Sequence, residues 1–163
     1  MRIMGIDPGT RRVGYGVIDK EGADLRTVAF GTICTKPKTA LPDRLKVIFE
    51  QISSLINEHS PEVVVVEEVF AGKGSKSSIK IGEGRGVILL CAAMGGTTVA
   101  EYTATNVKMA VVGNGHASKE QVQTMVKVIL GLAEHPEAED AADALASAIC
   151  HSHRSNIPDG LQG

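Results

Sequence analysis

The chain has 163 residues, 43% of them hydrophobic, which is enough to bury the core of one domain and too short for two of ordinary size. Its formal net charge of −2 argues against indiscriminate binding to polyanions, because non-specific DNA affinity comes mainly from neutralised phosphates. No early segment has the pattern of a signal peptide and no apolar run has the length of a membrane span, so we expect a cytoplasmic protein with no membrane partner.

The first half of the chain predicts three short strands, then a helix and a fourth strand. Residues 2–7, 13–19 and 25–33 are apolar runs separated by turn residues, which favours an antiparallel meander. Apolar residues at helical spacing predict a helix over 41–58. The β-branched run Val63–Val66 is typical of a strand that is covered on both faces.

The second half alternates between helix and strand. We expect a helix over 77–94 and a fifth strand over 97–101, followed by helices over 104–112, 118–131 and 139–153. Three glycines lower the helix propensity of the segment 77–94. They are better explained by the close approach of another backbone than by a dinucleotide-binding site, because no strand precedes them. They are Gly82, Gly84 and Gly86.

Strands that first form a meander and then alternate with helices predict an α/β fold. We expect a five-stranded mixed sheet, an antiparallel meander followed by parallel strands, with helices on both faces. Residues 1–154 form a single domain in this interpretation, and residues 155–163 form a flexible tail.

The cysteines do not suggest redox chemistry. Cys34, Cys91 and Cys150 are odd in number and far apart in sequence, which favours reduced, partly buried thiols over a disulfide framework. The run Cys150–His153 is a poor zinc site, because residues two apart on a helix point away from each other.

Two predicted strands end in carboxylates. Asp7 closes the first strand, and Glu67 and Glu68 follow the fourth. Burying an ionised carboxylate is costly without compensation, although an Asp-Pro-Gly-Thr turn would also account for Asp7 alone. If the first and fourth strands are parallel neighbours, Asp7 and Glu67 lie side by side, and alternation turns Glu68 the other way.

Asp140 and Asp143 form a second acidic pair, on one face of the last predicted helix. The helix macrodipole accounts for Asp140 without any function, and less well for Asp143, which adjoins a largely buried stretch. Converging carboxylates repel each other unless cations hold them ionised. Two Mg²⁺ ions would keep these carboxylates ionised and could activate a water for hydrolysis of a phosphodiester. Mn²⁺ would also accept such an oxygen-rich site.

Basic residues gather after the fourth strand, in a segment with few acids. This segment is either a solvated helix face or a nucleic-acid patch, and charge alone leaves both interpretations open. The residues are Lys73, Lys76, Lys80 and Arg85.

Together these motifs resemble those of the RuvC family of Holliday-junction resolvases, within the ribonuclease H-like superfamily. The opening motif alone also resembles that of actin-like ATPases, but the ordered set is highly specific and spans nearly the whole chain. The segments are GIDPGTRRVGYGVI, LPDRL, VEEVF, KIGEGRGV, VK at 107 and 108, and DAADALASAI.

The resemblance implies roles for individual residues. Glu68 stands where many relatives have a neutral residue, so it is an alternative ligand. Lys119 begins a helical segment, where a cation is disfavoured, so an anion is expected nearby. The implied catalytic and metal-binding acids are Asp7, Glu67, Asp140 and Asp143, with Lys119 also catalytic. The resemblance implies DNA contacts for Phe70, which would stack on bases, and for Lys108 and Lys119, and the basic segment adds Lys73, Lys76, Lys80 and Arg85 to the expected DNA-binding set.

The resemblance further implies a homodimer that cuts opposed strands of four-way junction DNA, leaving ligatable nicks with a 5′ phosphate, and a branch-migration motor complex of the RuvA and RuvB type as partner. Two copies related by a twofold axis meet through one self-complementary interface, which should use an apolar helix face. We expect that face on the 77–94 helix rather than on the 118–131 helix, unless the same residues cover the sheet. They are Ile79, Val87, Leu90 and Met94.

Three alternatives remain at this stage. A YqgF-like ribonuclease H-fold nuclease acting on ribosomal RNA precursors would share the opening motif. An actin-like phosphotransferase would hold phosphate at Gly9 and Thr10, but such enzymes need two lobes. A junction-binding protein without catalysis would be expected to lack one of the acids, and none is missing.

Overall fold

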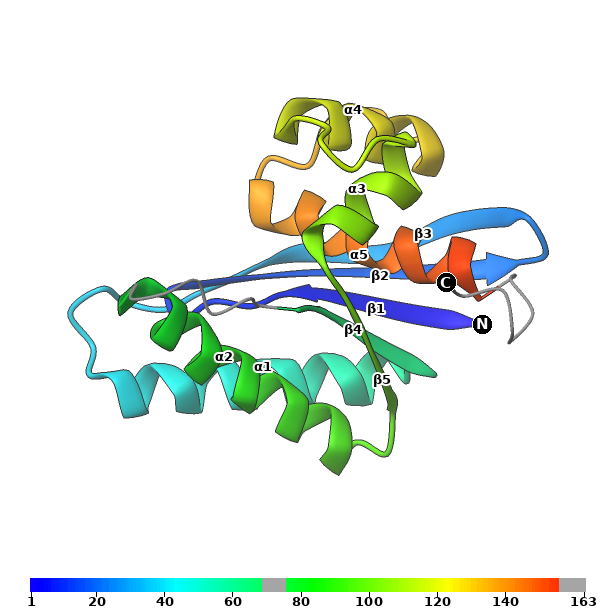
Figure 1. Cartoon of the computed structure of the whole chain (residues 1–163). Helices are drawn as coiled ribbons and strands as arrows, with labels where there is room; N and C mark the ends of the chain where they lie inside the picture. Colours follow the sequence, from blue (N-terminus) through cyan, green and yellow to red (C-terminus); the bar gives the residue numbers. More distant parts are fainter. Residues whose placement is uncertain (69–75, 156–163) are drawn as a thin grey trace.

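The computed structural model describes residues 1–68 and 76–155 (Figure 1). Each predicted element is present with small shifts at its ends, and nearly all of the predicted tail lies outside the described residues. The strands are β1 (Arg2–Asp7), β2 (Arg12–Glu21), β3 (Asp24–Cys34), β4 (Val63–Glu67) and β5 (Thr98–Tyr102). The helices are α1 (Leu41–His59), α2 (Lys76–Met94), α3 (Ala104–Val112), α4 (Lys119–Leu130) and α5 (Glu139–Arg154).

The strands form one mixed sheet in the order β3-β2-β1-β4-β5. β1 pairs antiparallel with β2, and β2 pairs antiparallel with β3, so the meander is confirmed. β4 lies parallel to β1 on one side and to β5 on the other. Ile6 is opposite Val66, so the last residues of the two strands, Asp7 and Glu67, lie at the same end of the sheet.

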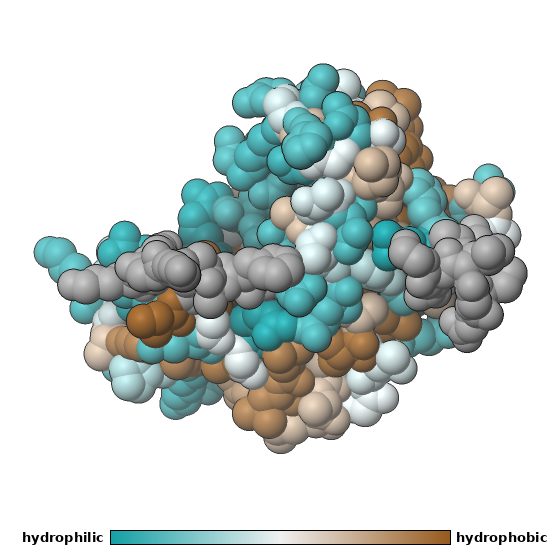
Figure 2. Space-filling model, in the orientation of Figure 1, coloured by the Kyte–Doolittle hydropathy of each residue, from teal (hydrophilic) through white to brown (hydrophobic). Residues whose placement is uncertain are grey.

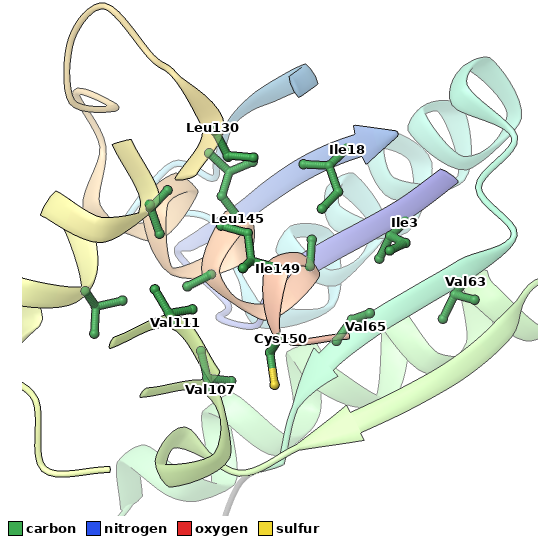
Figure 3. Packing of buried hydrophobic residues seen from close by; sticks show 14 of the residues in the cluster. Ile3, Ile18, Val63, Val65, Val107, Val111, Leu130, Leu145, Ile149 and Cys150 are labelled. Atoms are coloured by element: carbon green, nitrogen blue, oxygen red, sulfur yellow. The ribbon is translucent and has the colours of Figure 1, made fainter. Parts of the chain in front are cut away.

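Helices cover both faces of the sheet, as predicted. α1 and α2 lie together on one face, while α5 lies directly on the other, with α3 and α4 packed outside it (Figure 1). The side chains of β4 alternate between the two cores: Val63 and Val65 face α5, and Val64 and Val66 face α1. Figure 3 shows Leu145 and Ile149 of α5 between the strands and the outer helices.

Glycines on β1 and β2 set how closely α5 approaches the sheet. A Cβ atom added at Gly5 would overlap the carbonyl oxygen of Ala144, and one at Gly14 would overlap that of Asp140. Side chains there would hold the helix away from the strands. These two contacts therefore fix the height of the acidic end of α5 above the sheet.

The glycines of α2 have different surroundings from one another. Gly84 packs against the backbone of Gly9, which confirms the close approach expected there. Gly82 and Gly86 have no such neighbour among the residues that the structure describes, so close packing does not explain them there. α2 thus contacts the turn that follows Asp7 through one glycine.

The cysteines are all free thiols. Cys91 and Cys150 are buried, but Cys34 is exposed at the end of the edge strand β3, so the expected partial burial was wrong for Cys34. Among the helices that the structure describes, none combines the length and the apolar character that crossing a membrane requires.

Candidate active site

The two strand-end acids lie at the edge where β1 and β4 finish. Both side chains are half-buried. Each acid is the last residue of its strand, and the residue before it, Ile6 or Val66, is fully buried. Their charges act on each other: the carboxylate of Glu67 contributes to the raised pKa of Asp7. Glu68, by contrast, is exposed and lies just beyond the end of β4.

The acids of α5 reach the same edge from above the sheet. The close contact of Gly14 with the backbone of Asp140 brings the first turn of α5 onto β2. Asp143 follows one turn later, and its side chain, like that of Asp140, is 27% exposed. The four predicted carboxylates therefore meet where two strand ends lie beneath the start of one helix.

Burial and mutual repulsion perturb this group. The pKa of Asp7 is raised to about 7, first by burial and then by the charges of Asp143, Glu67 and Asp140. Burial also raises the pKa of Glu67, and the charge of Asp143 adds to this effect. The pKa of Asp143 is raised for the same first reason, against the opposing hydrogen bond from Lys119. Such perturbed acids are typical of functional sites.

The acids divide between two adjoining hollows, each of which carries a cation. Asp7 and Asp140 line the first, where Arg12 Nε lies 2.6 Å from Asp140 Oδ2. Glu67 and Asp143 line the second, where Lys119 Nζ lies 3.1 Å from Asp143 Oδ2. Each hollow thus combines one acid from a strand end and one acid from α5 with basic side chains, which are Arg11, Arg12 and Lys80 in the first hollow and Lys119 in the second.

Lys119 has the anionic neighbours that its position predicts. It is the first residue of α4, and its ammonium also lies 3.0 Å from Glu139 Oε2. Burial alone would lower the pKa of Lys119, but hydrogen bonds to Glu139 and Asp143 raise it above its usual value. Lys108, on α3, lies close enough to Glu67 for its charge to lower the pKa of that carboxyl.

The donor set fits a hard divalent cation. All four acids offer carboxylate oxygens, the ligands that Mg²⁺ and Mn²⁺ accept, and their mutual repulsion would be relieved by added positive charge. Within residues 1–68 and 76–155, no three carboxylate, imidazole or thiol groups stand close enough to enclose an ion as they are. The pairing of Asp140 with Arg12 and of Asp143 with Lys119 engages acids that an ion would need.

The other predicted DNA-binding residues are only partly placed. Phe70 and Lys73 lie outside the described residues, and Lys76 begins α2. Lys80 is exposed and lines the hollow of Asp7 and Asp140. Arg85 instead forms an ion pair with Glu101 of β5 and is only 22% exposed, so we do not retain it in the DNA-binding set.

Sequence reasoning missed two residues of the site. Arg12 pairs with Asp140, and Glu139 shares Lys119 with Asp143. The sequence does place Arg12 and Gly14, two apart on one strand, on the same face of that strand. No local pattern, however, says which helix covers that face.

The chain resembles proteins of known activity along almost its whole length. The family model for crossover junction endodeoxyribonuclease RuvC matches residues 3–151. The chain belongs to the RuvC family. One relative in this family, the crossover junction endodeoxyribonuclease RuvC of Syntrophomonas wolfei, is 47% identical over 162 residues, which cover 99% of this chain and 94% of that protein.

Solved structures give the same result for the fold. The RuvC of Thermus thermophilus, in a complex with Holliday junction substrate, superposes with a TM-score of 0.89 at 35% identity, covering 95% of this chain and 94% of that one. The yeast mitochondrial Holliday junction resolvase Ydc2 superposes with a TM-score of 0.65 at 10% identity, covering 93% and 78%. The architecture is therefore the ribonuclease H-like fold of the RuvC resolvases.

Proposed function

We propose that the chain is a structure-selective endonuclease that resolves four-way (Holliday) DNA junctions, by paired metal-dependent hydrolysis that leaves ligatable 5′-phosphate nicks. The observation that carries this proposal is the convergence of Asp7, Glu67, Asp140 and Asp143 in a chain of the RuvC family. The alternative of a YqgF-like nuclease on ribosomal RNA precursors is not favoured, because the family match is to RuvC.

The four acids would hold two divalent ions, with Mg²⁺ as the working ion and Mn²⁺ as a substitute. Bound there, the ions would supply an activated water and charge stabilisation at the scissile phosphate. The raised pKa values of Asp7 and Glu67 support this role. Burial and neighbouring carboxylates disfavour the ionised form of both acids, and a bound cation would favour it. Glu68 is exposed, whereas the four proposed ligands are all partly buried, which makes Glu68 a poorer candidate for a ligand.

The basic residues would hold and neutralise the DNA backbone. Lys119 and Lys108 flank the hollow of Glu67, where each stabilises negative charge, so both suit a contact with the phosphate that is cut. Lys80 lies beside the other hollow and suits a neighbouring phosphate. Phe70 stays in the proposed set from the family resemblance, stacking on a splayed base, and Lys73 and Lys76 stay in it from the local cluster of basic residues in the sequence.

A homodimer would place two such sites on the two opposed strands. The outward face of α2 supports this proposal, because Ile79, Leu90 and Met94 are 66%, 53% and 68% exposed there. Val87 of the same predicted set is partly buried against the core. Figure 2 shows apolar surface over this part of the molecule.

We further propose a cytoplasmic location and a branch-migration motor of the RuvA and RuvB type as partner.

The test is cleavage of a labelled mobile four-way junction, with structured RNA as the competing substrate. Wild type should cut the junction symmetrically in Mg²⁺ and leave the RNA intact. Asp7→Asn should cut at least about 100-fold more slowly, because it removes one metal ligand, yet bind the junction in Ca²⁺ nearly as well.

The matched control is Asp24→Asn, which makes the same change at the exposed start of β3. It should cut at the wild-type rate. Equal rates for Asp7→Asn and wild type would remove Asp7 from the mechanism, and preferential cutting of the RNA would favour the YqgF-like activity instead.

A further inference from the structure

Arg12 is placed against Asp140 by the packing of α5 on β2. Arg12 and Gly14 share the face of β2 that carries α5, and Gly14 lets the backbone of Asp140 approach. The result is an ion pair with Arg12 Nε 2.6 Å from Asp140 Oδ2. This contact joins residues far apart in the sequence and lies inside the proposed metal site.

The pair occupies an acid that a metal ion would need. A guanidinium and a divalent cation compete for the same carboxylate oxygen, so binding of one weakens binding of the other. The side chain of Arg12 is 56% exposed, so the chain can leave Asp140 without opening the core. Lys119 differs, since it holds both Glu139 and Asp143 and keeps one partner if it loses the other.

The same hollow offers Arg12 a second partner once DNA is bound. Asp7 and Asp140 lie on its acidic side, and Arg11 and Lys80 line it with Arg12. A phosphate that approaches the two acids with bound metal would therefore meet these cations. Arg12 is the one among them that pairs with a proposed metal ligand in the part of the chain that the structure describes.

We propose that Arg12 exchanges partners, holding Asp140 in the metal-free protein and moving to a DNA phosphate when a metal ion takes Asp140. This inference rests on the proposed function of the site. It makes metal binding and junction binding mutually favourable, because each ligand displaces the same ion pair. Arg12 would thus be a positioning residue that keeps the acidic site from binding metal fully until DNA arrives.

The first experiment measures Ca²⁺ binding to DNA-free protein by titration calorimetry. Arg12→Gln should bind Ca²⁺ about three- to fivefold more tightly than wild type, because the competing pair is gone. Arg11→Gln is the matched control, since Arg11 is an exposed arginine of the same hollow with no ion pair to a described residue. It should change the Ca²⁺ affinity by less than about twofold.

The second experiment measures junction binding at fixed ionic strength, with EDTA and with saturating Ca²⁺. Arg12→Gln should bind the junction about as well as wild type in EDTA and about three- to fivefold more weakly in Ca²⁺. Arg11→Gln should weaken binding by the same factor in both conditions. Arg12→Lys should restore part of the Ca²⁺ dependence, because it keeps a charge that can move between the two partners.

Two results would overturn the exchange. One is an unchanged Ca²⁺ affinity for Arg12→Gln, and the other is a loss of junction affinity that is the same with and without Ca²⁺. Failure of the proposed function looks different: wild type itself would then leave the junction uncut in Mg²⁺, whatever the calorimetry of Arg12→Gln shows.

Discussion

At the scale of single residues, the acidic site balances repulsion against two basic side chains. Arg12 and Lys119 each neutralise one aspartate of α5, while the strand-end acids Asp7 and Glu67 have no ion pair within the described chain. The pKa values of these two strand-end acids are accordingly raised by burial and by their acidic neighbours. The uncompensated charge is thus concentrated at the strand ends, where cations from solvent would bind most favourably.

His151, at the opposite end of α5, also has a shifted pKa. Its Nδ1 is 2.9 Å from the hydroxyl of Tyr102 on β5. Burial lowers the pKa of His151, and the ammonium of Lys20 on β2 lowers it further, while Arg154 on the same helix lies over the Tyr102 ring. The folded protein therefore favours the neutral imidazole.

This environment predicts that the contribution of His151 to stability is lost in acid. The unfolded chain takes up a proton at His151 near its ordinary pKa, whereas the folded chain takes it up only at lower pH, so this contribution falls as pH drops below about 6.5. The raised pKa of Asp7 acts in the opposite direction over the same range, so the test compares variants with wild type. On going from pH 8 to pH 5.5, the free energy of unfolding in urea should change more favourably for His151→Gln than for wild type. His116→Gln, at an exposed turn, should change as wild type does. Identical changes for all three proteins would exclude a contribution of His151.

At the scale of elements, the packing of α5 on β1 depends on glycine. Gly5→Ala should destabilise the fold by about 1–3 kcal/mol, because the new methyl group meets the backbone of Ala144 and cannot be relieved by a side-chain rotation. Gly82→Ala, in open space on α2, should instead stabilise the helix by about 0.5–1 kcal/mol. Thermal and urea unfolding of both variants would check the opposite signs, and a neutral Gly5→Ala would mean that α5 can shift away from β1 at little cost.

Much of this architecture was predictable from local patterns. The run Val63–Val66 indicated a strand covered on both faces, and the parallel pairing of β1 with β4 then brought Asp7 beside Glu67. The ion pairs of Arg12 and Arg85 were not predictable, since each depends on which element lies against the residue. Charge alone suggested DNA binding for Arg85, but Glu101 of the neighbouring strand engages it.

At the scale of the whole molecule, residues 1–68 and 76–155 offer a single group of four carboxylates, whereas resolving a junction requires two opposed cuts. Two copies related by a twofold axis satisfy this requirement with one self-complementary surface. The exposed face of α2 is the candidate, because Leu90 and Met94 are exposed there although Ile88 and Cys91 of the same helix are buried. An exposed apolar face on a helix already anchored to the core fits contact with a second copy.

The symmetry is tested by Leu90→Glu, which places a charge on each side of the proposed interface. The two carboxylates would face each other across the twofold axis, so we expect at least about tenfold weaker dimerisation. Val128→Glu is the control, because Val128 is 65% exposed on α4, away from α2. Sedimentation at micromolar concentration should give a monomer for Leu90→Glu and a dimer for wild type and Val128→Glu.

On a supercoiled cruciform plasmid, the dimers should release linear product within one binding event, whereas Leu90→Glu should release nicked circles. A Leu90→Glu protein that stays dimeric would move the interface elsewhere, and nicked circles from dimeric wild type would argue against paired cutting.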